Sequence, residues 1–208
     1  MKLVLLDNNC KLFLIKIKLS LILIMLIINQ NLEYFFFCKY LDDKIKKNIL
    51  KFNKINLIYS NKNIKTLFND LDKFSTFCKS KQIRFFIIDN YKLAVKYKAN
   101  GLFLSSSNKN KSYNNLPCNQ FKIIGSAHNQ IEYFHKFRQK CEMITLSPVF
   151  FTKKYSCNKV IGINKFNLTV KNWRTKSIAL GGIKKKNLNK LRMIKCNGFG
   201  FISLIEEI

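Results

Sequence analysis

The sequence predicts an α/β fold, and in particular a closed (β/α)8 TIM barrel of parallel strands. Eight short apolar runs follow one another from residue 33 onward, and each run is continuous rather than alternating. Continuous runs of this kind are typical of strands that are buried on both faces. Lysine-rich stretches with helical spacing separate them. Because strands that alternate with helices favour a parallel sheet, the count of eight indicates the barrel, with an open doubly wound sheet as the alternative.

The individual elements follow from the same patterns. Asn129 and Asn187 are candidate caps near the starts of two of the expected helices. The polar stretch Ser105–Asn119 is expected to be a loop that leaves room for a short helix. The four segments with apolar residues at helical spacing are Ile64–Lys79, Tyr91–Lys98, Asn129–Lys140 and Lys186–Cys196. The eight expected strands are Tyr34–Cys38, Ile55–Tyr59, Ile83–Ile88, Gly101–Leu104, Phe121–Ile124, Met143–Leu146, Ser177–Leu180 and Gly198–Ser203.

The 208 residues suffice for one sizeable core, and we expect a single barrel domain over residues 33–208. Residues 1–32 form an apolar extension of uncertain role. Within it, Leu19–Ile28 is too short to cross a bilayer comfortably, which takes ~20 residues. No convincing small-residue cleavage site follows this run, so we expect neither a signal peptide nor a membrane partner.

The formal net charge is +27, but the basic residues are almost all lysine. Only Arg84, Arg138, Arg174 and Arg192 are arginines among 38 basic residues. Nucleic-acid readers usually depend on arginine, and these lysines are scattered, so we expect a solvated surface and no nucleic-acid partner. The seven cysteines form no CxxC pair and no metal-spaced cluster. They predict reduced thiols and a cytoplasmic protein; a homo-oligomer is compatible with this sequence.

The ends of the seventh and eighth runs predict a site for a phosphorylated small molecule. Gly181 and Gly182 follow the seventh run, where paired glycines let backbone N–H groups approach an anion. Ile202 and Ser203 end the eighth run. In barrels, the loops after strands seven and eight together commonly bind phosphate.

Polar side chains at three other strand ends have two interpretations each. Ser126 and His128 would bind substrate or move a proton, or they would merely start the next helix. Thr152 and Lys154 would reach a phosphate, although lysine is common throughout the chain. Asp89 would be a Mg²⁺ ligand, or would cap the helix that starts near Tyr91.

Taken in order, these segments resemble the superfamily of thiamine phosphate synthases and TenI-like thiazole tautomerases. The resemblance runs from about residue 55 to the C-terminus and is strongest over residues 121–205. Five motifs carry it, in the family's order and spacing: IIGSAHN, MITLSPVFFTKK, VIGI, IALGGI and GFGFISLI. It implies a (β/α)8 barrel that joins hydroxymethylpyrimidine diphosphate to thiazole phosphate, with Mg²⁺, and releases pyrophosphate.

The resemblance also implies a role for each candidate residue. Ser126 would face the pyrimidine or its diphosphate. Asp89 matches the first Mg²⁺-binding aspartate, and Lys62 matches the lysine of the family's diphosphate-binding segment. The thiazole phosphate would be held by Gly181, Gly182, Ile202 and Ser203, with Thr152 and Lys154 nearby.

Two motifs depart from the family pattern, and both concern the diphosphate. The segment from Ile58 to Lys62 lacks the family's glutamine and arginine, and Asn108 stands where the second Mg²⁺ aspartate is expected. The phosphate half of the site therefore looks intact and the diphosphate half eroded. Two alternatives stay open: a thiazole tautomerase with His128 as acid and base, and a non-catalytic binder of thiazole phosphate or thiamine phosphate.

Overall fold

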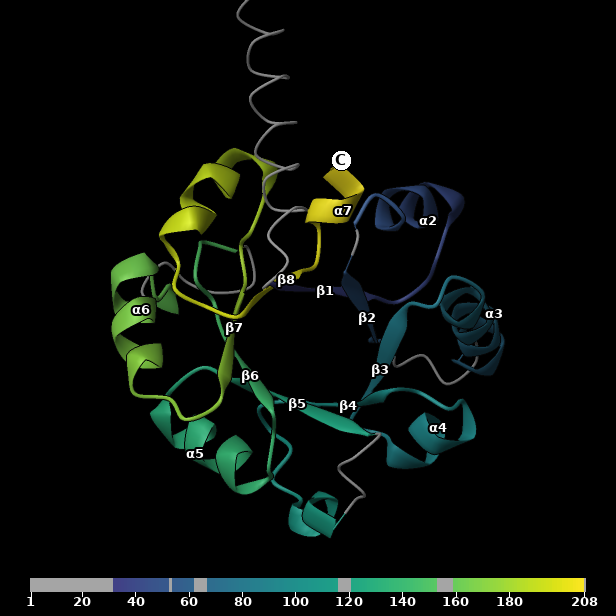
Figure 1. Cartoon of the computed structure of the whole chain (residues 1–208), viewed down its shortest axis with the longest axis horizontal. Helices are drawn as coiled ribbons and strands as arrows, with labels where there is room; N and C mark the ends of the chain where they lie inside the picture. Colours follow the sequence, from purple (N-terminus) through teal and green to yellow (C-terminus); the bar gives the residue numbers. More distant parts are fainter. Residues whose placement is uncertain (1–31, 53, 62–66, 116–120, 153–158, 208) are drawn as a thin grey trace, which may run out of the picture.

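In a computed structural model, the chain forms a closed barrel of parallel strands, which confirms the predicted fold class (Figure 1). The structure describes residues 32–52, 54–61, 67–115, 121–152 and 159–207. Each strand pairs with the next in sequence, and β8 pairs with β1 to close the ring. The strands are β1 (Glu33–Cys38), β2 (Ile55–Tyr59), β3 (Arg84–Ile88), β4 (Gly101–Leu104), β5 (Lys122–Ala127), β6 (Met143–Leu146), β7 (Lys176–Leu180) and β8 (Gly198–Phe201).

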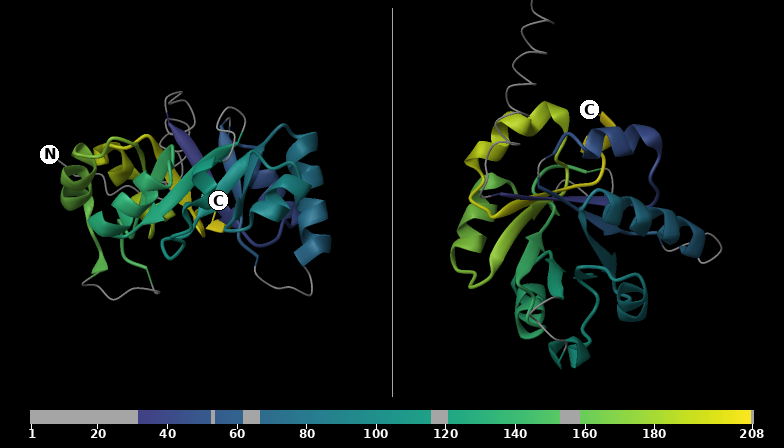
Figure 2. Two further views of the ribbon diagram at one scale, coloured as in Figure 1. Left: turned by 90° about the horizontal axis from the view of Figure 1, so that it is seen from below. Right: turned by 45° about the vertical axis from the view of Figure 1, so that its right-hand side comes forward.

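Helices surround the ring of strands, as the views in Figure 2 show. The α-helices are α2 (Asp43–Ile49), α3 (Leu67–Ser80), α4 (Tyr91–Lys96), α5 (Gln130–Arg138), α6 (Ile163–Lys171) and α7 (Leu204–Glu207). Two 3₁₀ helices, η1 (Lys111–Asn115) and η3 (Lys185–Met193), complete the set among the described residues. The last helix lies beside α2, where Asn48 Nδ2 donates to the carbonyl of Ile205 at 2.9 Å (Figure 1).

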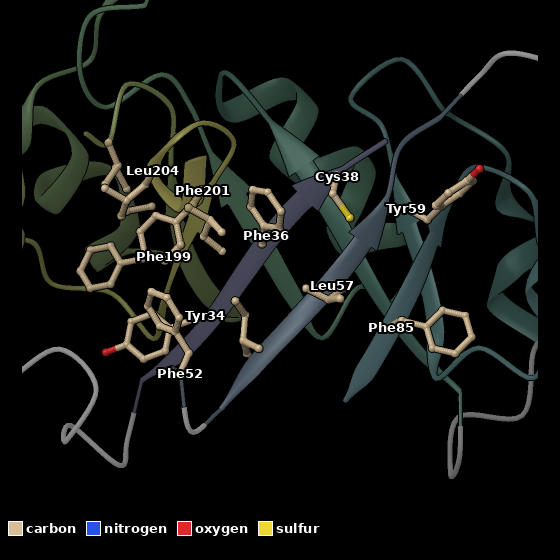
Figure 3. Packing of buried hydrophobic residues seen from close by; sticks show 14 of the residues in the cluster. Tyr34, Phe36, Cys38, Phe52, Leu57, Tyr59, Phe85, Phe199, Phe201 and Leu204 are labelled. Carbon is tan, nitrogen blue, oxygen red and sulfur yellow. The ribbon is translucent and has the colours of Figure 1, made fainter. Parts of the chain in front are cut away.

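Side chains of β1 to β7 fill two separate apolar layers, whereas β8 contributes only to the outer one. Of two successive side chains in one strand, one packs between the strands and the helices, as Phe36, Leu57 and Phe85 do (Figure 3). The other points into the barrel, where the filling is rich in phenylalanine. The interior cluster consists of Phe35, Ile58, Phe86, Phe103, Ile124, Met143 and Ile178. Burial on both faces explains why the strands read as continuous apolar runs.

The end of the chain differs from the sequence-based expectation. The segment expected as a helix over Lys186–Cys196 is a 3₁₀ helix, in which Leu188, Leu191 and Ile194 are buried three positions apart. The N–H of Ile194 donates to the carbonyl of Leu191, three residues back, at 3.0 Å. Three residues per turn suits a 3₁₀ helix and not an α-helix. The expected eighth strand also ends early, since β8 stops at Phe201 and Ser203 directly precedes α7. The helices α2 and α6 were not individually predicted.

The N-terminal apolar run lies outside the described residues, as does nearly all of the extension over residues 1–32. Among the helices that the structure describes, none has the length and apolar character needed to cross a bilayer. The four cysteines in this part of the chain, Cys38, Cys78, Cys141 and Cys196, are free thiols.

The buried thiol of Cys78 in α3 makes stability depend on pH. Burial raises the pKa of Cys78 from 9.0 to about 12, so the folded thiol stays neutral while the unfolded one ionises above pH 9. A raised pKa contributes stability that is lost as pH rises. Between pH 7 and pH 10, the wild-type free energy of unfolding should lose about 1.4 kcal/mol that the Cys78→Ala variant does not lose. Urea melts at both pH values measure this difference.

Ser75→Ala is the matched control, because Ser75 is buried on the same helix and does not titrate in this range. Its destabilisation should be the same at pH 7 and at pH 10. A destabilisation by Cys78→Ala that also stays constant between the two pH values would contradict the expected linkage.

Candidate functional site

The candidate site lies at the carboxyl ends of the strands, where the turn after β7 packs on the loop after β6. We call Gly181 and Gly182 the glycine turn. Two backbone hydrogen bonds fix the contact: Val149 N–H donates to Leu180 O and Phe150 N–H to Gly181 O, both at 3.0 Å. The peptide bond before Pro148 is cis. This end of a (β/α)8 barrel is where active sites lie.

Only glycine fits at both positions of the glycine turn. The φ angles are +96° at Gly181 and +70° at Gly182, values that side chains disfavour. A Cβ on Gly181 would lie 2.8 Å from Pro148, and one on Gly182 only 2.4 Å from the carbonyl oxygen of Phe150. The sequence therefore carries two glycines here for close backbone approach as well as for conformation.

Thr152 follows this contact and has an orphaned hydroxyl. The carbonyl oxygen of its neighbour Phe151 lies 2.6 Å from where a Cβ on Gly182 would be. The Oγ1 atom of Thr152 is buried and has no hydrogen-bond partner among the residues that the structure describes. A buried hydroxyl without a partner points to a ligand or a water at that position. Thr152 and the glycine turn thus form one corner of the site.

The side chain of Asn187 binds the glycine turn. Its Nδ2 donates to Gly182 O at 2.8 Å, and its Oδ1 accepts from Lys184 N–H at 2.9 Å. Asn187 thus reaches back to the start of η3, as its candidacy for a cap indicated, but its bond to Gly182 was not anticipated. Ile202 is 59% exposed just after β8, and Ser203 is half-buried beside it.

Two predicted site residues, Lys62 and Lys154, lie outside the described residues. Their placement at the diphosphate and at the thiazole phosphate stays a prediction.

At the end of β5, Ser126 belongs to the strand and does not cap the helix. It is buried and pairs in register with Thr145 of β6. Thr145 is fully buried as well, and its Oγ1 has no partner among the described residues. Thr145 was not predicted as a site residue, although a lone hydroxyl in the apolar run Met143–Leu146 was a usable signal. Asn129 caps α5, as predicted, by accepting from Glu132 N–H at 2.9 Å.

His128 is tied to Glu132, one turn into α5. Glu132 Oε2 accepts from the His128 backbone N–H at 2.7 Å and lies 2.9 Å from His128 Nδ1. The carboxylate oxygen at this distance suits the tautomer that carries its hydrogen on Nδ1. In that tautomer Nε2 is the acceptor nitrogen, which is the atom that would act as a general base.

A pocket of about 380 Å³ opens between the ends of β5 and β6. His128, Asn129, Ser147, Pro148 and Lys159 line it. Pro148 also contacts the glycine turn, so the pocket and the phosphate corner share a wall. A larger cavity of about 680 Å³, around Trp173 and Asn197, lies by the starts of β7 and β8, at the end of the barrel away from the candidate site.

Asp89 stands at the end of β3 in a conformation that few side chains adopt, with φ of 51°. Its Oδ1 accepts from Ser105 N–H at 3.0 Å and from Asn108 Nδ2 at 2.7 Å. It does not cap α4, because Asn90 accepts from Leu93 N–H and fills that role. The structure therefore brings Asp89 and Asn108 together.

The residues present suit a magnesium ion only in part. Asp89 supplies one carboxylate, and Mg²⁺ is often held by one or two carboxylates plus substrate phosphates and water. Asn108 as placed turns its amide nitrogen to Asp89, while its Oδ1 accepts from Asn110 N–H at 3.0 Å. The described residues hold no group of three histidine, cysteine, aspartate or glutamate side chains. A metal here would depend on Asp89 and on the substrate's own oxygens.

The fold and the glycine turn define the class: a (β/α)8 barrel with its candidate site at the carboxyl ends of β5 to β8. The chain belongs to the thiamine monophosphate synthase family, whose model matches residues 39–205. This match confirms the resemblance read from the five sequence motifs.

Individual relatives agree with this membership. The chain is 30% identical over 132 residues to a thiamine-phosphate synthase of Prochlorococcus marinus (strain AS9601), covering 63% of this chain and 37% of that one. It is 28% identical over 137 residues to that of Flavobacterium psychrophilum, covering 62% and 66%. The chain thus spans about a third to two thirds of the length of these curated relatives.

Solved structures share the fold. A thiamine phosphate pyrophosphorylase from Pyrococcus furiosus matches with a TM-score of 0.67 at 17% identity, covering 84% of this chain and 87% of that one. One from Bacteroides thetaiotaomicron matches with a TM-score of 0.55 at 14% identity, covering 83% of each chain.

Proposed function

We propose that this protein is a transferase that joins hydroxymethylpyrimidine diphosphate to thiazole phosphate and produces thiamine phosphate and pyrophosphate. The observation that carries the proposal is the corner formed by the glycine turn and the orphaned hydroxyl of Thr152. A phosphate there would accept from Thr152 and from backbone N–H groups. Ile202, Ser203 and Lys154 would complete this half of the site.

In the proposed reaction, the bond between the pyrimidine methylene carbon and the diphosphate oxygen breaks, and its electron pair leaves with pyrophosphate. The lone pair of the thiazole nitrogen then forms the new C–N bond. The chain's part is to hold the thiazole phosphate in line, to keep water from the methylene cation, and to receive the departing charge. Ser126 would orient the pyrimidine, and Lys62 would face the diphosphate.

Asp89 is the residue proposed to hold Mg²⁺, with Asn108 next to it. Bound magnesium would supply positive charge to the diphosphate oxygens. Asn108 brings no negative charge, so the site should bind the metal more weakly than a pair of aspartates would. Asp89 would hold the ion against the diphosphate, and Asn108 would keep the Asp89 carboxylate in place.

Pyrophosphate release tests the proposal. With both substrates and Mg²⁺, the protein should release pyrophosphate at a rate proportional to enzyme concentration. Omitting thiazole phosphate should remove most of this release. Equal release without thiazole phosphate would identify a hydrolase and contradict the transferase.

A second candidate function, thiazole tautomerase, is favoured by the His128–Glu132 pair, which prepares a base beside the pocket. If the protein isomerises a thiazole phosphate, His128→Gln should lower that rate by roughly 10²-fold or more. The same variant should leave thiamine phosphate formation within about threefold. NMR of the two thiazole isomers measures the first rate. A wild-type protein that produces no isomerisation would exclude this candidate.

The partners of the proposed function are phosphorylated small molecules. A cytoplasmic location agrees with the free thiols and stays a prediction, as do a homo-oligomeric state and the lack of a nucleic-acid partner.

A further inference from the structure

Lys136 of α5 is a lysine with 0% of its surface exposed. Its Nζ donates to the backbone carbonyl of Asn108 at 2.5 Å and to Gln139 Oε1 at 3.0 Å. Burial lowers the pKa of Lys136, while the nearby Cys141, Asp89 and Glu132 act in the opposite direction. Because a buried ammonium is costly, a lysine at such a position needs a reason beyond filling space.

The backbone of β5 makes room for this side chain. A Cβ on Gly125 would lie 2.9 Å from the Cδ and Cγ atoms of Lys136, and equally close to Cys141 Sγ. Gly125 thus lets the stem of Lys136 pass behind the strand. The ammonium arrives at the loop after β4, which leads from Ser105 to Asn110.

Gln139, three residues further along the chain, forms hydrogen bonds to the same loop. It is 1% exposed, and its Nε2 donates to the carbonyls of Asn108 at 3.2 Å and Asn110 at 2.8 Å. Two buried side chains from one helical segment therefore hold a loop that lies about 30 residues away in sequence.

The loop that Lys136 and Gln139 hold also contacts Asp89. Asn108 Nδ2 and Ser105 N–H both donate to Asp89 Oδ1, at 2.7 Å and 3.0 Å. Lys136 and Gln139 donate to the backbone carbonyl of Asn108. This carbonyl is only a few covalent bonds from the side-chain amide that contacts Asp89. The orientation of the Asp89 carboxylate consequently depends on how firmly residues 105–110 are held.

We propose that Lys136 and Gln139 are positioning residues that hold loop 105–110 so that Asp89 and Asn108 meet the diphosphate and its metal ion. This inference rests on the proposed function, in which Asp89 serves the diphosphate. In this proposal, the buried side chains of Lys136 and Gln139 compensate for the family residues that are missing from the diphosphate-binding segments. A loop fixed by two side chains needs less ordering when the ligand binds.

Lys136→Met tests the proposal, since methionine keeps much of the stem and removes the ammonium. Calorimetry should show that affinity for magnesium pyrophosphate falls about tenfold or more. Affinity for thiazole phosphate should stay within about twofold, because the glycine turn is untouched. Hydrogen exchange of the amides of residues 105–110 should accelerate. The matched control is Arg138→Met, which removes one positive charge from an exposed position of the same helix and should change none of these quantities.

Gln139→Glu is the second variant, in case Lys136→Met folds poorly. It keeps the shape and gives Lys136 a carboxylate partner, but it removes both amide donors to the loop. The same selective loss is expected. Equal loss of both affinities, in parallel with melting temperature, would overturn positioning in favour of a purely structural role. A wild-type protein that binds no magnesium pyrophosphate would refute the proposed function. Unchanged hydrogen exchange of residues 105–110 in both variants would instead refute the claim that Lys136 and Gln139 hold this loop.

Discussion

Replacing Gly182 with alanine should abolish tight binding of thiazole phosphate and lower kcat/KM for it by roughly 10²-fold or more. The new Cβ would lie 2.4 Å from Phe150 O and 2.6 Å from Phe151 O, so the turn must move away from the loop that carries Thr152. Phosphate recognition by backbone N–H groups depends on that geometry. Calorimetric titration with thiazole phosphate measures the loss directly.

Gly162→Ala is the matched control for backbone strain. Gly162 has a φ of 72° and a ψ of 167°, a combination that side chains rarely adopt, but a Cβ there meets no atom within 4 Å. This variant should lower the melting temperature and leave the affinity for thiazole phosphate within about threefold. An equal loss of affinity in both variants would show that backbone strain, and not the close approach at Gly182, causes the effect.

Asp89→Asn should lower kcat for thiamine phosphate formation by roughly 10²- to 10³-fold, since a metal or a charge contact at a phosphoryl group contributes several kcal/mol. Asparagine suits this test because it tolerates the positive φ of Asp89 and still accepts from Ser105 N–H. The variant therefore removes the negative charge and little else. The Mg²⁺ concentration needed for half-maximal activity should rise as well.

Asp72→Asn is the control, because it removes one carboxylate at an exposed position of α3. Its rate and its Mg²⁺ dependence should match those of the wild type. If Asp89→Asn retained full activity at low Mg²⁺, Asp89 would be only a loop anchor for residues 105–110.

The barrel was predictable because it depends on a repeated pattern. Met143–Leu146 and Gly101–Leu104 were expected as strands with the bounds that the structure has. Where the chain changes to a spacing of three, as at Leu188 and Leu191, an α-helix was the wrong expectation. The short helix α2 has only seven residues, which leaves little periodicity to detect.

The candidate site was predictable only where a residue type has a specific structural role that the sequence reveals. Two glycines after a strand indicate a close backbone approach, and the structure has that approach at Gly182. Lys136 gave no such signal, because 38 basic residues make a single lysine uninformative and its burial depends on Gly125 of another element. Glu132 was likewise missed, since its bond to His128 resembles any capping contact in the sequence.

The most direct test of the central claim is thiamine phosphate formation by the purified 208-residue chain with hydroxymethylpyrimidine diphosphate, thiazole phosphate and Mg²⁺. We expect thiamine phosphate in amounts equal to the pyrophosphate released, and formation by Gly182→Ala that is slower by roughly 10²-fold or more at low thiazole phosphate. Binding of thiazole phosphate without any thiamine phosphate would contradict the transferase and leave the tautomerase or a protein that only binds the phosphate.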